Sequence, residues 1–358
     1  MATRSTARRY GALAVLLIAA ACSDGDPPTS RTCDDAAPGG SELRSAPPPG
    51  ASTEPTPAEL EVSGARLVFC ADLADPFVLN VDRPIGERSF VFGTQTPDAN
   101  LPVLITKGII RSEKVQDALP TLPAWAADGG SWAPAVLQRD DRFVLYYTTT
   151  DAASGRQCIS VATSPSAEGP NADISAAPLV CPVELGGAID PSPFVDADGN
   201  AFLYWKNDGN CCGVPARLWV QPLSADGLSL SGPPTELLGA DQAWEGGVVE
   251  APSMADVDGA LFLFYSGNAW NTAAYAIGYA TCASPTGPCT KPLDHPWLGS
   301  SSRYAGPGGA EVFHDADGRA RLVFHAWSAD AIGYANNGYR QVLTTGLAVI
   351  DGRPVTQE

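Results

Sequence analysis

Three acidic residues occupy nearly the same place in three similar segments of the chain. Asp75 and Asp190 each stand directly before a proline, and Glu250 stands two positions before Pro252. Carboxyl groups held close together raise one another's pKa, so one can stay protonated while another stays ionised. Hydrolysis of a glycosidic bond needs this combination, because one acid protonates the leaving oxygen while a carboxylate acts on the opposite face of the sugar.

A repeat along the chain predicts that these acids meet in space. Five prolines mark it at intervals of 55 to 61 residues, and an aromatic-rich segment such as RFVLYYT (142–148) follows each of them. The marker residues are Pro76, Pro134, Pro191, Pro252 and Pro307. A period of this length is typical of a radial array, and each repeat can hold about four short strands. We therefore predict an all-β fold, a five-bladed β-propeller with four-stranded antiparallel blades around a central channel.

The propeller would place the three acids at one end of that channel, because the first strand of every blade lines the axis. Taken alone, an aspartate before a proline is more often a turn initiator whose side chain bonds its own backbone. The register that Asp75 and Asp190 share with Glu250 favours catalysis instead. Glu245 and Asp72 lie close by in sequence and are the alternative acids.

The first 21 residues have the pattern of a signal peptide. Arg4, Arg8 and Arg9 precede an apolar stretch that is too short for a permanent membrane span. The stretch ends IAAAC, which resembles a bacterial lipoprotein box and predicts cleavage before Cys22 and lipidation of that cysteine. An ordinary secretory signal cut near the same alanines is the alternative. We therefore expect an exported protein, anchored as a lipoprotein at the outer membrane or cell surface, or else secreted.

Composition separates a tether from a folded domain. Residues 22–60 are rich in proline, glycine and serine and predict an extended tether, whereas residues 61–358 suit a single propeller. The formal net charge is −18 at pH 7, and phosphate contacts need basic partners, so nucleic acid and anionic lipid are poor partners. We expect a polysaccharide or oligosaccharide substrate, membrane contact only through a lipid on Cys22, and a monomer.

Eight cysteines remain besides Cys22, and an even number in an exported protein predicts disulfides. The pairs expected from their spacing are Cys158 with Cys181, Cys282 with Cys289, and Cys33 with Cys70. The adjacent Cys211 and Cys212 are then left, either as a rare vicinal bridge or within another of the roughly 105 pairings that eight cysteines allow.

Several blocks occur in a characteristic order: ADPFVL (74–79), GSWAPAVL (130–137), IDPSPFVDADGNAFLYW (189–205) and VEAPSM (249–254). Together with GYATCASPTGP (278–288) and LVFHAW (322–327), they resemble the conserved blocks of glycoside hydrolase family 43. The resemblance implies a five-bladed propeller that removes arabinose or xylose from plant polysaccharides with inversion. It also implies that Asp75 is the general base, that Glu250 is the general acid, and that Asp190 orients Glu250 and tunes its proton affinity.

Two positions depart from that family's pattern. Ala135 follows WAP where an acid is frequent, and Gly309 stands where members that hold an axial metal have a histidine. We therefore expect no cofactor and disfavour a structural calcium ion at the axis. Two rival functions stay open: a retaining glycosidase of the fructan-cleaving kind, and a glycan-binding propeller that has lost catalysis.

Further side chains are candidates for contacting a sugar, because aromatic faces stack on sugar rings and amides bond hydroxyls. The candidates are Phe77, Trp132, Trp205, Asn207, Trp270, Tyr304 and His325. For the aromatic residues the alternative is packing between blades, and for His325 it is a place in the core. Asn207 and its neighbours Lys206 and Asp208 could equally form a solvated loop.

Overall fold

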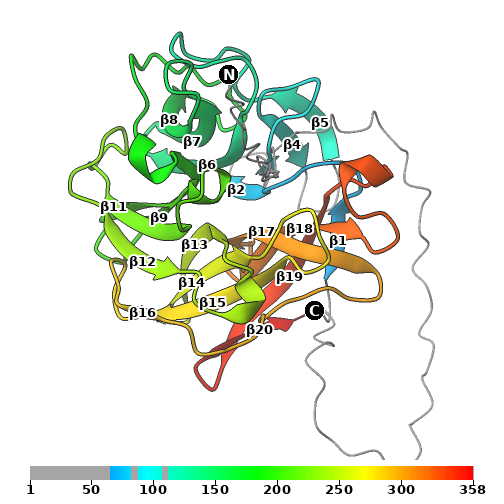
Figure 1. Cartoon of the computed structure of the whole chain (residues 1–358). Helices are drawn as coiled ribbons and strands as arrows, with labels where there is room; N and C mark the ends of the chain where they lie inside the picture. The colour runs from blue at the N-terminus through cyan, green and yellow to red at the C-terminus, as the bar shows by residue number, and fades with distance from the viewer. Residues whose placement is uncertain (1–64, 82–87, 107–111, 358) are drawn as a thin grey trace, which may run out of the picture.

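Five antiparallel sheets surround a common axis in the computed structural model, which describes residues 65–81, 88–106 and 112–357 (Figure 1). Each sheet is one blade, and the blades follow one another around the ring in chain order. The predicted all-β, five-bladed propeller is confirmed. In the part of the chain that the structure describes, no helix is long and apolar enough to cross a membrane.

The first three blades are built from consecutive strands, the first strand of each lying innermost. Blade I contains β2 (Phe77–Val81), β3 (Arg88–Phe92), β4 (Pro102–Thr106) and β5 (Ser112–Asp117). Blade II contains β6 (Trp132–Arg139), β7 (Arg142–Thr150) and β8 (Gln157–Ser164). Blade III contains β9 (Ala188–Val195), β10 (Ala201–Asn207), β11 (Arg217–Pro222) and β12 (Thr235–Gly239). In blade II the place of a fourth strand is taken by a segment that pairs with β8 through two isolated bridges, Thr163 with Ala172 and Ile159 with Val180.

The last two blades complete the ring. Blade IV contains β13 (Val249–Val257), β14 (Ala260–Gly267), β15 (Ala276–Cys282) and β16 (Cys289–Thr290). Blade V contains β17 (Tyr304–His314), β18 (Ala320–Ser328) and β19 (Gln341–Ile350), with β1 (Arg66–Phe69) and β20 (Arg353–Gln357) both paired to β19. Because β1 comes from the start of the described chain and β19 from its end, this pairing joins the two ends of the ring (Figure 1). Short 3-10 turns lie between strands: η1 (Val183–Leu185), η2 (Gly209–Cys211), η3 (Ala243–Glu245) and η4 (Tyr334–Asn336).

Five hydrophobic clusters hold the blades together, one at each of the five interfaces between neighbouring blades. Strand β7 shows how the sequence builds them. Its Phe143 and Leu145 pack toward blade I, whereas the alternating Val144 and Tyr146 pack toward blade III. Successive side chains of a strand point to opposite faces, so a strand covered on both sides must be apolar at every position. This explains the unbroken apolar segments in each repeat.

A β-bulge at the marker proline recurs in blades II to V, whereas in blade I the proline directly precedes β2. In blade II, for example, Ala133 and Pro134 together face one residue of the next strand, because Trp132 pairs with Thr148 and Ala135 with Tyr146. The residue before the proline has left-handed backbone in all five blades: Asp75, Ala133, Asp190, Ala251 and Gly306, with φ between 44° and 58°. A bulge re-aims a side chain and accommodates a proline, which has no N–H for the ladder. The repeat in the sequence is thus a repeat of this left-handed residue and its proline.

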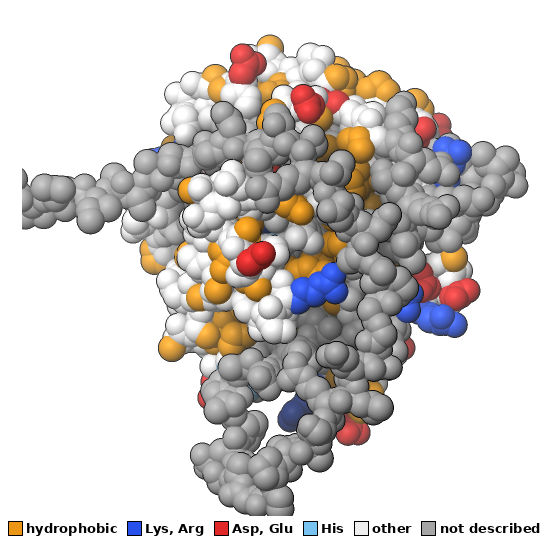
Figure 2. All heavy atoms as spheres, turned by 90° about the vertical axis from the view of Figure 1, so that its right-hand side faces the viewer, with side chains coloured by type: hydrophobic (Ala, Val, Ile, Leu, Met, Phe, Trp, Pro, Cys, Tyr) orange, Lys and Arg blue, Asp and Glu red, His pale blue; other side chains and the backbone are white. Residues whose placement is uncertain are grey.

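On the described surface seen in Figure 2, acidic and basic side chains are distributed among hydrophobic and uncharged ones. Two peptide bonds before proline are cis, Gly169–Pro170 and Gly287–Pro288.

Candidate active site

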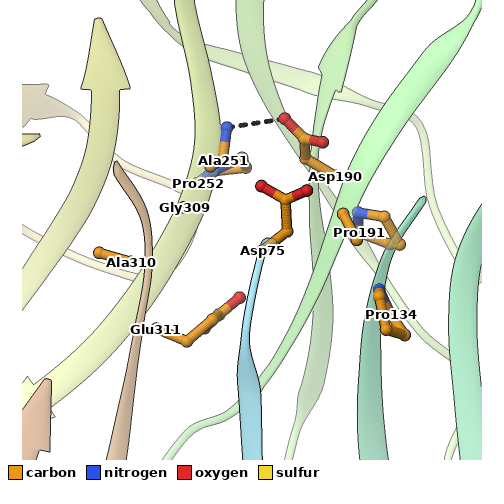
Figure 3. A pocket seen from close by; sticks show the side chains of 10 residues that line it. Asp75, Pro134, Asp190, Pro191, Ala251, Pro252, Gly309, Ala310 and Glu311 are labelled. Atoms are coloured by element: carbon orange, nitrogen blue, oxygen red, sulfur yellow. Dashed lines mark hydrogen bonds between the residues drawn. The ribbon is translucent and has the colours of Figure 1, made fainter. Parts of the chain in front are cut away.

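The five inner strands enclose one pocket at the end of the channel (Figure 3). Its lining residues are Asp75, Ala133, Pro134, Asp190, Pro191, Ala251, Pro252, Gly309, Ala310 and Glu311. All but the last three are marker prolines or the residues directly before them, so these positions bring Asp75 and Asp190 together, while Glu250 is not among the lining residues. Asp75 lies between Asp190 and Glu311 in the close view (Figure 3).

Asp75 is held by contacts that favour its ionised form. Thr94 donates its hydroxyl to Oδ2 at 2.6 Å, and the Arg340 guanidinium lies 3.9 Å from the same oxygen. Burial is the largest single influence on the pKa of Asp75 and raises it, but the charge of Arg340, the imidazole of His325 and the Thr94 bond together leave it lowered. Asp75 is therefore a carboxylate at neutral pH, as a general base must be.

His325 holds the backbone of Asp75 in place. Its Nδ1 accepts the backbone N–H of Asp75 at 3.0 Å, so the imidazole proton belongs on Nε2, an atom without a hydrogen-bond partner in the structure. Complete burial lowers the pKa of His325 to about 3, which keeps the ring neutral. The Tyr275 ring stacks on the imidazole with ring centroids 6.0 Å apart. His325 thus positions Asp75 and is too deeply buried to stack on a sugar.

Asp190 has the opposite tendency. Its Oδ2 accepts the backbone N–H of Ala251 at 2.9 Å (Figure 3), and its own N–H donates to Thr148 Oγ1 at 3.2 Å. Burial and the negative charge of Glu250 raise the pKa of Asp190 to about 8, although the Lys206 ammonium acts against them. The negative charge of Glu250 therefore helps burial to keep the proton on Asp190 near neutral pH.

In blade IV the left-handed residue before the proline is Ala251. Glu250 precedes it, so its place in the strand differs by one residue from the places of Asp75 and Asp190. Its Oε1 accepts the Tyr275 hydroxyl at 2.8 Å, and its Oε2 accepts the Lys206 ammonium at 2.7 Å. Glu250 is 9% exposed and Lys206 1%, so this is a buried ion pair. Both carboxylate oxygens are fixed, which orients the group beside Asp190.

A fourth carboxyl, Glu311 on β17, also lines the pocket. Ser253 donates its hydroxyl to Glu311 Oε2 at 2.6 Å. Burial raises the pKa of Glu311 to about 7, and hydrogen bonds from Ser253 and Ser192 partly oppose it. No sequence pattern marks this residue, because it lies four positions beyond the marker Pro307 and shares no register with the other acids.

Four of the predicted sugar contacts are used inside the protein. Trp205 is 1% exposed and stacks on Trp219, with ring centroids 5.6 Å apart. Asn207 donates to the carbonyl oxygens of Leu185 and Pro215, and its Oδ1 accepts from the Arg217 backbone and the Trp219 indole. Phe77 and Tyr304 are partly buried and pack on hydrophobic clusters between blades. None of these four side chains is among the residues that line the pocket, and their contacts with a sugar stay predictions.

Trp132 and Trp270 are half-buried and nearer to the acids. Trp132 directly precedes Ala133, which lines the pocket. The Arg340 guanidinium lies 4.7 Å from the centre of the Trp270 ring, and it also lies beside Asp75. These two remain the best placed of the predicted aromatic contacts.

The alternative acids have structural partners. Glu245 is fully buried and bonds the Lys291 ammonium and the Tyr265 hydroxyl. Asp72 accepts the Arg340 backbone N–H at 2.7 Å and the Tyr334 hydroxyl at 3.0 Å. Neither carboxyl is among the residues that line the pocket.

Two of the expected disulfides are present, Cys158–Cys181 and Cys282–Cys289. Cys70 is also disulfide-bonded, but Cys33 and the lipidation candidate Cys22 lie outside the described residues, so those two predictions stay untested. Cys211 and Cys212 carry free thiols.

The position of Gly309 does not suit a metal ligand. Its φ is 58°, and a Cβ there would lie 2.9 Å from Asp75 Oδ1 and 2.8 Å from the His325 ring. Within the described ranges, no three His, Cys, Asp or Glu side chains are grouped to hold a metal ion. The described residues at this position therefore do not fit an axial metal ion.

The propeller thus brings the partly buried carboxyl groups of Asp75, Asp190 and Glu311 to one pocket. The chain belongs to glycosyl hydrolases family 43, whose family model matches residues 67–351. The resemblance predicted from the sequence blocks is confirmed.

Individual relatives agree with this assignment. The chain is 30% identical over 174 residues to "Beta-D-galactofuranosidase xynD" of Aspergillus niger, covering 46% of this chain and 47% of that protein. It is 27% identical over 266 residues to "Arabinoxylan arabinofuranohydrolase" of Bacillus subtilis, covering 65% and 48%. The chain thus spans about half the length of these curated relatives. A crystal structure of a thermostable family-43 glycoside hydrolase superposes with a TM-score of 0.71 at 26% identity, covering 81% of this chain and 94% of the other.

Proposed function

We propose that the protein is an inverting glycoside hydrolase that acts on arabinose- or xylose-containing polysaccharides. The observation that supports this most is the opposite protonation of two carboxyls in one pocket, Asp75 with a lowered pKa and Asp190 with a raised one. A base and a proton reservoir facing one another are what inverting hydrolysis needs. The sugar class comes from relatives whose names refer to arabinoxylan, xylosides and arabinosides.

In the proposed reaction Asp75 takes a proton from a water molecule, which attacks the anomeric carbon. Glu250 first takes the proton held on Asp190 and then gives it to the leaving oxygen. Negative charge then develops on Glu250, and the Lys206 ammonium at 2.7 Å stabilises it. The Tyr275 hydroxyl keeps the carboxyl oriented throughout. No metal or cofactor takes part in this scheme.

We also propose that the protein is exported, that it contacts the membrane only through a lipid on Cys22, and that it acts as a monomer. Palmitate labelling of the wild-type chain and of Cys22→Ser in cells tests the anchor, and loss of label in the variant is expected. Label that persists in the variant would contradict it.

The function is tested by incubating the purified chain with arabinan, arabinoxylan, xylan and small aryl glycosides, with Glu250→Gln as the paired variant. Gln keeps the size of the side chain and cannot donate the proton. We expect the wild type to release arabinose, xylose or their oligomers and the variant to lose at least about 10²-fold in kcat on substrates with poor leaving groups. Pull-down of a polysaccharide without sugar release by the wild type would instead indicate the glycan-binding rival.

A further inference from the structure

Two adjacent cysteines sit in the loop between β10 and β11, next to the elements that hold Glu250. Cys211 ends η2 and is exposed, while Cys212 is half-buried. Their Sγ atoms lie 2.8 Å apart. Side chains of neighbouring residues in an extended strand point to opposite sides, so this contact depends on the turn.

The turn directs both sulfurs toward one backbone carbonyl. The Cys212 N–H donates to the carbonyl of Gly209 at 2.9 Å and closes the turn. The carbonyl of Asp208 then lies 2.9 Å from Cys211 Sγ and 3.6 Å from Cys212 Sγ. From the neighbouring blade, the Arg156 guanidinium donates to Cys212 Sγ at 2.9 Å. The loop therefore holds the two thiols together before any bond joins them.

The rest of the described chain indicates that this protein forms disulfides. Cys158 with Cys181, Cys282 with Cys289, and Cys70 are all bonded, and Cys211 and Cys212 are the remaining cysteines among the described residues. An environment that oxidises those cysteines will also oxidise two thiols in contact. We propose that Cys211 and Cys212 are a thiol–disulfide exchange site that closes to a vicinal disulfide, the oxidant being a molecule that carries a disulfide.

The exchange balances in two steps. The sulfur of Cys212 attacks the donor disulfide, forms a mixed disulfide and releases one donor thiol. The sulfur of Cys211 then attacks Cys212 Sγ, forms the vicinal bond and releases the second donor thiol. The two protons of the cysteine thiols end on the two donor thiols, so the cysteines are oxidised and the donor is reduced.

A bridge between neighbours should open more easily than the other two. Adjacent Cα atoms lie about 3.8 Å apart across a trans peptide, shorter than the roughly 4.4–6.8 Å that relaxed disulfides span, and strained bonds are more reducible. Cys211 is exposed, whereas Cys158 is fully buried. Opening or closing the Cys211–Cys212 bond also bears on the candidate site, because both sulfurs lie against the carbonyl of Asp208. The Oδ1 atom of Asp208 lies 4.0 Å from the Lys206 ammonium that binds Glu250.

Thiol labelling tests the proposal without any enzyme assay, so its outcome is independent of the proposed function. The full chain is purified without reductant, treated with N-ethylmaleimide before and after graded dithiothreitol, and mapped by peptide mass spectrometry. We expect no label on the 211–212 peptide at first, with a mass lower by two hydrogens than the dithiol. Low reductant should then allow two labels there before any label appears on the Cys158 or Cys282 peptides.

The variants Cys211→Ser and Cys212→Ser are the controls, since each leaves one thiol that should label without reductant and thereby shows that the loop is accessible. Labelling of both wild-type cysteines without reductant would overturn the proposal. So would a cross-link from either cysteine to a third one, or release of this pair only after the other bridges have opened.

Discussion

At the scale of single residues, the pocket separates charge and proton between two aspartates that occupy equivalent positions before marker prolines. Asp75 faces Arg340 and Thr94, whereas Asp190 faces Glu250. Identical side chains in the same backbone setting therefore acquire different roles from their neighbours. The general-base role of Asp75 and the supporting role of Asp190 stay predictions.

The rate should consequently depend on pH in a bell shape. Activity needs Asp75 ionised and the Asp190–Glu250 pair protonated, so kcat/KM should rise with pH through the lowered pKa of Asp75 and fall above about pH 8. In Asp190→Asn the negative neighbour that keeps the proton on the pair is lost, so the alkaline limb should move to lower pH. Initial rates from pH 3 to 10 measure both limbs, and an alkaline limb that stays in place in the variant would argue against the shared proton.

Lys206 offers a second residue-scale prediction. Replacing it with Met removes the charge that stabilises Glu250 after proton donation, so we expect kcat to fall by about 10²-fold. Breaking a buried pair should also cost about 3–5 kcal/mol of folding stability.

The matched control for that variant is Lys291→Met. Lys291 forms another buried pair, its ammonium 2.6 Å from Glu245 Oε1, away from the pocket. It should lose comparable stability in thermal unfolding while the folded enzyme keeps its kcat. Equal losses of kcat in the two variants would mean that Lys206 acts only through folding.

At the scale of elements, the left-handed residue before each marker proline is the unit that builds the site. A left-handed backbone costs a residue with a Cβ roughly 1–2 kcal/mol, and such strain is retained where the surrounding structure supports it. Here Asp75 and Asp190 carry the carboxyls, while Ala133 and Ala251 have the same conformation without a functional side chain. The left-handed residue before the proline therefore belongs to the architecture of the blade, and two of its five copies carry a carboxyl group.

Gly309, the second glycine of β17 with a left-handed backbone, lies close enough to Asp75 to test how that carboxyl is positioned. Gly309→Ala should lower kcat/KM by about 10–10²-fold, since the added Cβ would lie 2.9 Å from Asp75 Oδ1 and displace it.

Gly318→Ala is its control, because that glycine also has positive φ, 74°, and a Cβ there would meet nothing within 4 Å. Both variants should lose about 1–2 kcal/mol in denaturant unfolding. An unchanged kcat/KM in the folded Gly309→Ala enzyme would show that Asp75 is not held against this strand.

At the scale of the whole molecule, closure of the ring decides which residues meet. The first described strand, β1, pairs with β19, and a hydrophobic cluster joins blade V to blade I. This closure brings His325 and Arg340 to Asp75, about 250 residues earlier in the chain. The pocket is thus a property of the complete ring.

The sequence could predict the propeller and three of the acids, because the marker proline repeats at a fixed period and marks the channel. It could not predict their partners. Lys206 and Tyr275 reach Glu250 from 44 and 25 residues away, through the packing of neighbouring strands, and no local pattern marks such contacts. Trp205 was misleading for a related reason, since blades cover both faces of β10 and an aromatic residue there is core.

The measurement that tests the central proposal most directly is proton NMR of the first product released from a defined aryl arabinofuranoside or xyloside. If Asp75 activates water while Glu250 protonates the leaving group, the sugar must appear first with the anomeric configuration opposite to that of the substrate, before mutarotation mixes the two forms. Asp75→Asn should release no detectable sugar under the same conditions. A first product that retains the configuration of the substrate would contradict the account and indicate a covalent intermediate of the retaining kind.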